Sequence, residues 1–195
     1  MSTSSYIIAG LGNPGPAYQW TRHNAGFLFL DRMAHLENAA VTHKKFSGVS
    51  AELNFAGQRL ILLKPLTFMN LSGKSVMQAL QFYKLPLSNL IVIHDELDLN
   101  FGTVRLKNGG GHGGHNGLRS IIENLGKADF IRLRIGIGKA PDGNTTDHVL
   151  GRITPEQMEK LPVILDGAIE MLQVMLKEGI AKSMSLYNNK NFLEG

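Results

Sequence analysis

Short apolar runs alternate along the chain with longer stretches in which apolar residues recur at helical spacing. The first run, Tyr6–Ala9, is bulky and too short for a helix, which is typical of a buried strand. After a polar loop, an apolar stripe at helical spacing predicts a helix from about Asn24 to Glu37. The first predicted elements are therefore a strand, a polar loop and a helix.

The same alternation continues through the rest of the chain. Further strands are predicted over Gly48–Phe55, Gln58–Lys64, Leu90–Ile93, Thr103–Lys107 and Phe130–Gly138. Further helices are predicted over Ser72–Tyr83, from Leu118 to Leu125, and from the capping box that begins at Thr154. Pro162 should kink this last helix or restart it. This order of strands and helices predicts one α/β domain over residues 1–195.

The composition is that of a soluble globular protein, with 43% hydrophobic and 18% charged residues in 195. No apolar run approaches the roughly 20 residues that span a bilayer, and residues 1–5 carry no basic segment typical of a signal peptide. The chain has no cysteine, so disulfides and thiolate chemistry are excluded. These features are compatible with a cytoplasmic protein.

The positive charge is concentrated in one part of the chain. The net charge is +4, but residues 105–139 hold seven lysines and arginines against two acids, a local charge of +5. Two of these arginines, Arg132 and Arg134, alternate with apolar residues, which predicts a half-buried strand with an arginine-bearing face. Such a sector suggests a polyanionic partner, although chance clustering on a solvated surface explains the charge alone equally well.

Two nucleotide-binding motifs are matched only superficially. Gly10-x-Gly12-x-x-Gly15 follows a strand, but Pro14 and Pro16 lack the N–H groups that a pyrophosphate needs, and no second strand ending in an acid follows. The segment Gly73-Lys74-Ser75 resembles the end of a Walker A loop, yet it lies within a predicted helix. We therefore predict no nucleotide site at either segment.

Several polar residues follow, or lie near the ends of, apolar runs, where the strands of an open α/β sheet present ligand-binding groups. They are Asn13, His23, Asn70, Asp95 and Asn116. A histidine such as His23 suits proton transfer near neutral pH, and a carboxylate such as Asp95 can fix its tautomer. Asparagine amides can stabilise a developing oxyanion. Taken singly, an asparagine beside glycine or proline is more often a turn residue than a functional one.

The glycine loop, Asn108–Gly117, has two possible roles. Its glycines permit positive φ and close backbone approach, so the loop could bind an anion. A flexible connector would have the same composition. The cations Arg105, Lys107 and Arg134 on the flanking predicted strands favour phosphate recognition.

Two alternatives to a histidine-based hydrolase stay open at this point. A metal-dependent hydrolase could be built on His94, Asp98, His112 and His115. The basic sector alone would equally well suit a non-catalytic RNA-binding module.

Five separated segments carry most of these residues in order: Gly10–Gly15, Thr21–Gly26, Pro65–Gly73, His94–Asp98 and Gly109–Gly117. Together they resemble the signature segments of the bacterial peptidyl-tRNA hydrolase family, and the resemblance runs from about Tyr6 to about Tyr187. It implies a monomeric α/β hydrolase with a mixed twisted sheet flanked by helices on both faces, and no metal or other cofactor. The implied substrate is the ester that joins a peptide to the 3′ ribose of tRNA.

The resemblance also implies a role for each candidate residue. His23 would activate water as general base, Asp95 would orient His23, and Asn13 would complete the catalytic set. The residues implied to position the substrate or support the oxyanion are Asn13, Asn70 and Asn116, while Tyr18 and Met69 would line the peptide side. Lys107 and Arg134 would bind the 5′ phosphate of the tRNA, with Arg105 and His115 nearby.

Overall fold

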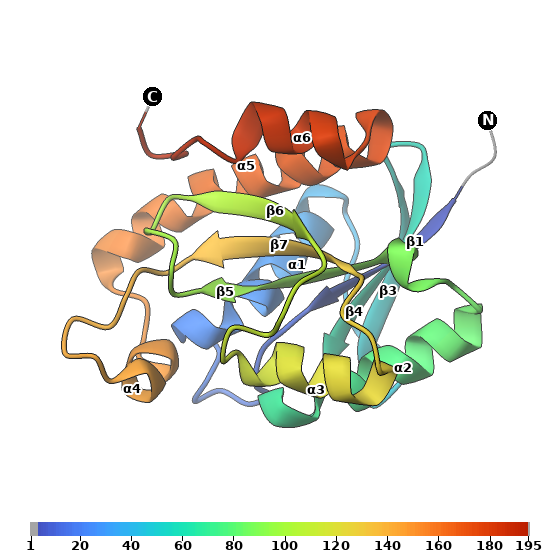
Figure 1. Ribbon diagram of the computed structural model, residues 1–195, viewed down its shortest axis with the longest axis horizontal. Coiled ribbons are helices and arrows are strands. Elements are labelled where there is room, and N and C mark those ends of the chain that lie inside the picture. Colours follow the sequence, from blue (N-terminus) through green and yellow to red (C-terminus); the bar gives the residue numbers. More distant parts are fainter. Residues whose placement is uncertain (1–3, 195) are drawn as a thin grey trace.

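The computed structural model describes residues 4–194 and contains a seven-stranded mixed sheet (Figure 1). The strands are β1 (Ser5–Gly10), β2 (His43–Lys45), β3 (Gly48–Phe55), β4 (Gln58–Pro65), β5 (Leu90–Glu96), β6 (Val104–Asn108) and β7 (Ile131–Gly136). They lie in the order β2-β3-β4-β1-β5-β7-β6. The neighbours β4, β1, β5 and β7 are parallel, whereas β2, β3 and β6 pair antiparallel with their neighbours. The predicted mixed sheet is confirmed.

Helices cover both faces of this sheet, as predicted (Figure 1). One face packs against α1 (Ala25–Leu36), α5 (Pro155–Glu178) and α6 (Ile180–Tyr187), and the other against α2 (Ser72–Tyr83) and α3 (Asn116–Leu125). Successive side chains of a strand point to opposite faces, so Ile8 packs on the α1 side and Ile7 on the α2 side. None of the described helices is long and apolar enough to cross a membrane.

Two helices and one strand were not predicted, and for helix α5 one of the two outcomes predicted at Pro162, a restart, is excluded. The strand β2 has three polar residues, and α4 (Thr145–Leu150) and α6 are short, so none shows a clear apolar period. Helix α5 does not restart at Pro162. Proline lacks the N–H that would bond the backbone carbonyl four residues earlier in the helix. Pro162 is exposed, so that carbonyl can bind water instead, while buried Leu161 and Leu165 hold the helix against the core.

The parallel strands bring their carboxyl ends to one edge of the sheet, where β1, β4 and β5 are followed by polar loops. Close packing of α1 against β1 fixes the first of these loops. A Cβ atom on Gly10 would lie 2.3 Å from the Gly26 carbonyl oxygen, and one on Gly12 would lie 2.6 Å from the Phe27 ring. These two glycines of the dinucleotide-like motif therefore serve helix–strand packing, which positions the residues just before α1.

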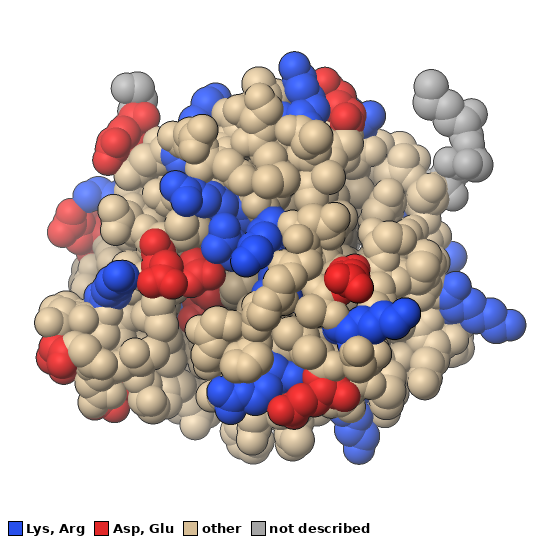
Figure 2. All heavy atoms as spheres, viewed as in Figure 1, with Lys and Arg blue, Asp and Glu red and all other residues tan. Residues whose placement is uncertain are grey.

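The face of the sheet that carries α2 and α3 also carries a basic patch over β6 and β7, where Figure 2 shows lysine and arginine side chains gathered. The antiparallel register pairs Arg105 with Arg134 and Lys107 with Arg132, so all four point to one face. We call these four residues the basic row.

The predicted absence of a targeting segment concerns residues 1–5, of which 1–3 lie outside the described residues.

Candidate active site

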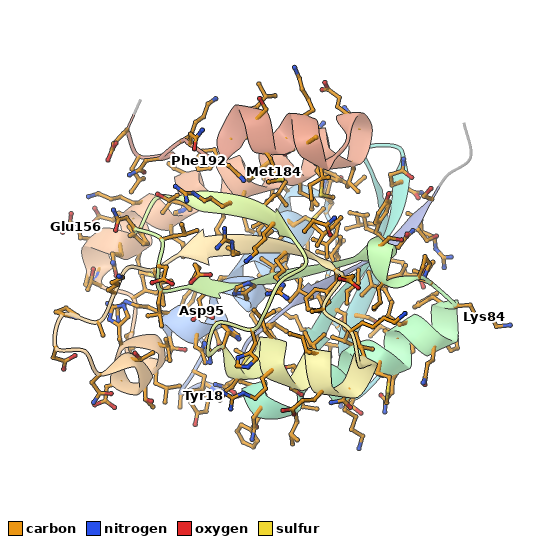
Figure 3. The ribbon with its side chains drawn as sticks, in the orientation of Figure 1. Tyr18, Lys84, Asp95, Glu156, Met184 and Phe192 are labelled. Carbon is orange, nitrogen blue, oxygen red and sulfur yellow. The ribbon has the colours of Figure 1, made fainter. Side chains whose placement is uncertain are left out.

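A cleft of about 640 Å³ lies at the carboxyl edge of the sheet. Figure 3 shows Asp95 at the end of β5 and Tyr18 on the loop that follows β1, both of which line this cleft. The cleft brings together every residue predicted for catalysis and substrate binding: Asn13, Tyr18, His23, Met69, Asn70, Asp95, His115 and Asn116. Residues far apart in sequence therefore meet at one site.

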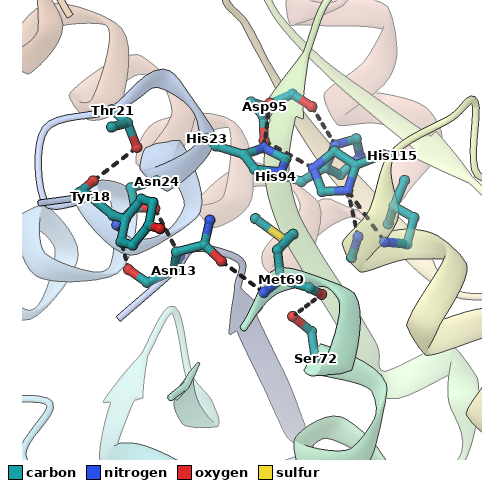
Figure 4. A network of polar contacts seen from close by, with 12 residues as sticks. Asn13, Tyr18, Thr21, His23, Asn24, Met69, Ser72, His94, Asp95 and His115 are labelled. Carbon is teal, nitrogen blue, oxygen red and sulfur yellow. Dashed lines mark hydrogen bonds and ion pairs between the residues drawn. The ribbon is translucent and has the colours of Figure 1, made fainter. Parts of the chain in front are cut away.

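His23 and Asp95 form a buried hydrogen-bonded pair (Figure 4). The Nδ1 atom of His23 lies 2.9 Å from Oδ1 and 3.0 Å from Oδ2 of Asp95. An ionised carboxylate only accepts hydrogen bonds, so Nδ1 of His23 carries the proton. In the neutral ring the lone pair is then on Nε2, on the opposite side of the imidazole from Asp95.

His115 is a second donor to the same carboxylate (Figure 4). Its Nδ1 accepts hydrogen bonds from the backbone N–H groups of Gly117 and Leu118 at 3.1 and 3.3 Å, which caps the start of α3. Its proton is therefore on Nε2, which donates to Oδ1 of Asp95 at 2.9 Å. Both ring nitrogens of His115 are engaged within the protein, although the residue lines the cleft as predicted.

The charges and hydrogen bonds among His23, Asp95 and His115 favour an ionised Asp95 and a basic His23. Burial raises the pKa of Asp95, but the charges and hydrogen bonds of His23 and His115 outweigh it and hold that pKa well below its ordinary value. Burial lowers the pKa of His23, but the charge and hydrogen bond of Asp95 outweigh it and leave that pKa raised. The imidazole is therefore a stronger base than an isolated histidine.

Asn13 is held in a fixed orientation beside this pair (Figure 4). Its Oδ1 accepts the backbone N–H of Met69 at 2.8 Å, which leaves the Nδ2 donor for the cleft. The backbone of Asn13 is fixed in turn by Asn24, whose Oδ1 accepts its N–H at 2.8 Å and whose Nδ2 donates to its carbonyl at 3.0 Å. Sequence reasoning missed Asn24, and the only signal was its place next to His23.

The remaining cleft residues include both polar and apolar side chains. Asn70 and Asn116 are exposed and present amides, Met69 is buried and Tyr18 is half-buried. Phe68, which is 57% exposed, and Leu150 of α4, which is 40% exposed, add apolar surface to the cleft. Sequence reasoning missed both residues, and α4 itself has no clear periodic pattern.

The four cations of the basic row have different surroundings. Lys107 is exposed, Arg105 and Arg134 are half-buried, and Arg132 is buried, so the predicted arginine-bearing face of β7 is present, but only Arg134 of its two arginines is partly open to solvent. An Nη atom of Arg134 lies 3.5 Å from a carboxylate oxygen of Glu96, which lines the cleft. The basic row therefore begins at the margin of the cleft.

The alternative metal site on His94, Asp98, His112 and His115 is not assembled. Asp98 does not line the cleft, and its Oδ1 lies 3.8 Å from Nζ of Lys139. His94 is buried, and its Nδ1 donates to the backbone carbonyl of Asp95 at 2.7 Å. Burial and the nearby His115 lower the pKa of His94 to about 3. Over residues 4–194 the one group with metal-ligand spacing is His23, Asp95 and His115, whose atoms already share hydrogen bonds.

A buried histidine–carboxylate pair at the carboxyl edge of an α/β sheet, with amide donors in the same cleft, is the equipment of an enzyme that uses general base catalysis, such as a hydrolase that activates water. The peptidyl-tRNA hydrolase family model matches residues 7–194. The chain therefore belongs to the peptidyl-tRNA hydrolase family.

Individual relatives and solved structures agree over the whole chain. The peptidyl-tRNA hydrolase of Pelobacter propionicus is 71% identical, covering 98% of this chain and 99% of its own, and that of Trichlorobacter lovleyi is 64% identical, covering 97% and 98%. A crystal structure of the Acinetobacter baumannii enzyme matches with a TM-score of 0.85 at 39% identity, covering 98% of this chain and 99% of that chain. A single-substitution mutant of that enzyme matches with a TM-score of 0.90 at 38% identity, covering 98% of each chain.

Proposed function

We propose that this chain cleaves the ester between a peptide and the 3′ ribose of tRNA, with His23 as the general base. The observation that carries the proposal is the bond from His23 Nδ1 to Asp95, which fixes the tautomer with its lone pair on Nε2. A base of this kind contributes roughly 10²–10⁴-fold to a rate. Because an ester has a good leaving group, such a base together with oxyanion donors is a sufficient mechanism.

The proposed reaction begins when His23 Nε2 takes a proton from water as the water oxygen attacks the ester carbonyl. The Nδ2 group of Asn13 is free to donate to the oxyanion, since its Oδ1 is already bound to Met69. Amides of Asn70 and Asn116 in the same cleft are further donors. When the tetrahedral intermediate collapses, the protonated His23 returns a proton to the ribose 3′ oxygen, and free peptide and tRNA leave.

The two sides of the cleft suit the two parts of this substrate. Tyr18, Phe68 and Met69 offer an apolar surface for the peptide. The basic row offers cations for the acceptor end of the tRNA, with Arg105, Lys107 and Arg134 as phosphate ligands. Phosphate contacts position a nucleic acid without reading its sequence, so one enzyme can act on many tRNAs.

His115 has a positioning role in this proposal. Because one of its nitrogens caps α3 and the other donates to Asp95, it connects the glycine loop to the carboxylate that orients His23. We assign it to this role in preference to direct substrate binding. We also propose a monomer, as the family resemblance implies, and a cytoplasmic location, because the proposed substrate is an intermediate of translation.

Lys107→Ala and Arg134→Ala are each expected to raise KM about tenfold or more while kcat changes little, since a charge-assisted hydrogen bond contributes about 1.5–3 kcal/mol. Each variant should also reduce the slope of log KM against log salt concentration by about 1. Steady-state kinetics between about 50 and 200 mM salt measure both effects. Lys177→Ala, an exposed cation of α5 on the opposite face of the sheet, is the matched control. Salt slopes equal to that of the parent would contradict a phosphate contact at these residues.

Chelator-treated protein mixed with an N-blocked aminoacyl-tRNA tests the function directly. We expect complete cleavage of the ester after exhaustive chelation. Loss of activity that returns with a divalent metal would support a metal-dependent hydrolase. Binding of intact substrate over hours without cleavage would support an RNA-binding module.

A further inference from the structure

We infer that Arg132 is a positioning residue for the glycine loop and not a ligand of the tRNA phosphate. The inference rests on the proposed function, because the loop brings Asn116 and His115 to the proposed site. It separates Arg132 from the other three cations of the basic row.

The guanidinium of Arg132 is enclosed by the protein. The residue is 2% exposed, and its two Nη groups donate to the carbonyl oxygens of Gly110 and Gly111. Its Cζ atom lies 4.8 Å from the centroid of the Phe130 ring. Two of its five N–H donors are therefore bound to the loop, and Nε is buried without a partner among the described residues, so the guanidinium is closed to a phosphate arriving from solvent.

The glycine loop needs such an anchor because its own backbone is soft. Gly109, Gly110, Gly113 and Gly114 all adopt positive φ, and glycine loses more conformational freedom on ordering than any other residue. At the far end of the loop, His115 is fixed by Asp95 and by the start of α3. At the near end, the backbone bond from Gly109 to Phe130 and the Arg132 guanidinium hold it.

The neighbours of Arg132 in the basic row make no such contact with the loop backbone among the described residues. Arg134, two residues along β7, has a side chain that is 21% exposed and faces Glu96. Lys107, opposite Arg132 in the register, is exposed. A Cβ built on Gly110 would lie 2.8 Å from Nζ of Lys107, so Lys107 also lies near the loop, but among the described residues only Arg132 of the basic row donates hydrogen bonds to the loop carbonyls.

Arginine suits this position better than lysine would. The carbonyls of consecutive residues require two donors held apart in one plane, which the guanidinium fork supplies. A lysine retains the positive charge but offers a single compact ammonium group. Arg132→Lys is therefore a conservative variant that keeps the charge and loses the fork.

The test compares Arg132→Lys with Lys107→Ala by amide hydrogen exchange and by kinetics. Arg132→Lys should speed exchange of the Gly109 and His115 amides at least tenfold and lower kcat about tenfold. Its KM and the salt dependence of KM should stay close to those of the parent, whereas Lys107→Ala should show the opposite pattern. An Arg132→Lys variant with unchanged loop exchange and kcat, or with a raised KM and a flatter salt dependence, would overturn the inference.

A second measurement uses the unaltered protein, so it holds even if the variant fails to fold. Arginine side-chain NMR is recorded while a 5′-phosphorylated acceptor-stem RNA hairpin is added. The Arg134 Nε signal should shift while the Arg132 signal stays in place, and an Arg132 shift as large as that of Arg134 would overturn the inference. If neither signal shifts, the proposed tRNA contact at Arg134 fails, and the exchange data of Arg132→Lys still decide the role of Arg132.

Discussion

His23→Ala is expected to lower kcat by roughly 10²–10⁴-fold, because it removes the base that takes the proton from water. The fold and the affinity for tRNA should persist, since the basic row is unchanged and Asp95 keeps its bond to His115. Single-turnover cleavage of an N-blocked aminoacyl-tRNA measures the first effect, and binding of deacylated tRNA measures the second.

The matched control for this variant is His35→Ala, because His35 is exposed on α1 and does not line the cleft. It should retain the activity of the parent. Turnover of His23→Ala within a few-fold of the parent would remove His23 from the mechanism.

Asp95→Asn is expected to have an effect of similar size, at least about 10²-fold in kcat. The carboxylate accepts hydrogen bonds from both His23 and His115. An amide of the same shape can keep an acceptor oxygen at the Oδ1 position, which contacts both histidines, but it places an NH₂ donor at the Oδ2 position, 3.0 Å from Nδ1 of His23. The NH₂ group would favour the His23 tautomer with its proton on Nε2, and in that tautomer the ring cannot accept a proton from water.

The pH dependence of kcat/KM should also differ between Asp95→Asn and the parent, because Asp95 sets the pKa of His23. In the parent, Asp95 raises the pKa of His23, so kcat/KM should fall as the pH drops through a value above the ordinary 6.5 of histidine. In Asp95→Asn only burial remains, and burial lowers the pKa, so the acid limb of the residual activity should move to lower pH. A limb that stays in place or moves to higher pH would contradict the proposed pairing.

Much of the fold could be predicted from the sequence because the central strands of the sheet are buried on both faces. Strands such as β1 and β5 are continuous apolar runs, and α1 and α2 carry clear apolar stripes. The strand β2 is too short and polar to be recognised, and α4 is fixed by contacts with other segments. The backbone N–H of Arg22 donates to the Gly151 carbonyl, and an Nη atom of Arg22 donates to the His148 carbonyl, a contact between residues 126 positions apart.

The residues of the site could be predicted from the sequence, but the hydrogen bonds that join them could not. Asn13 follows β1 and Asp95 lies at the end of β5, and a parallel sheet must bring these strand ends to one edge. The contacts themselves join residues far apart in sequence, such as His23 with Asp95 across 72 positions and Asn13 with Met69 across 56. For the same reason the partners of Asn24, His115 and Arg132 could be found only from the folded chain.

The most direct test of the central claim is a pH titration of the His23 ring nitrogens by ¹⁵N NMR, in the parent and in Asp95→Asn. In the parent at pH 8 we expect the proton on Nδ1 and none on Nε2, and protonation of Nε2 with a pKa above 6.5 that coincides with the acid limb of kcat/KM. A proton on Nε2 of His23 at pH 8, or a titration that does not coincide with the acid limb, would contradict the claim that an Asp95-oriented His23 is the general base.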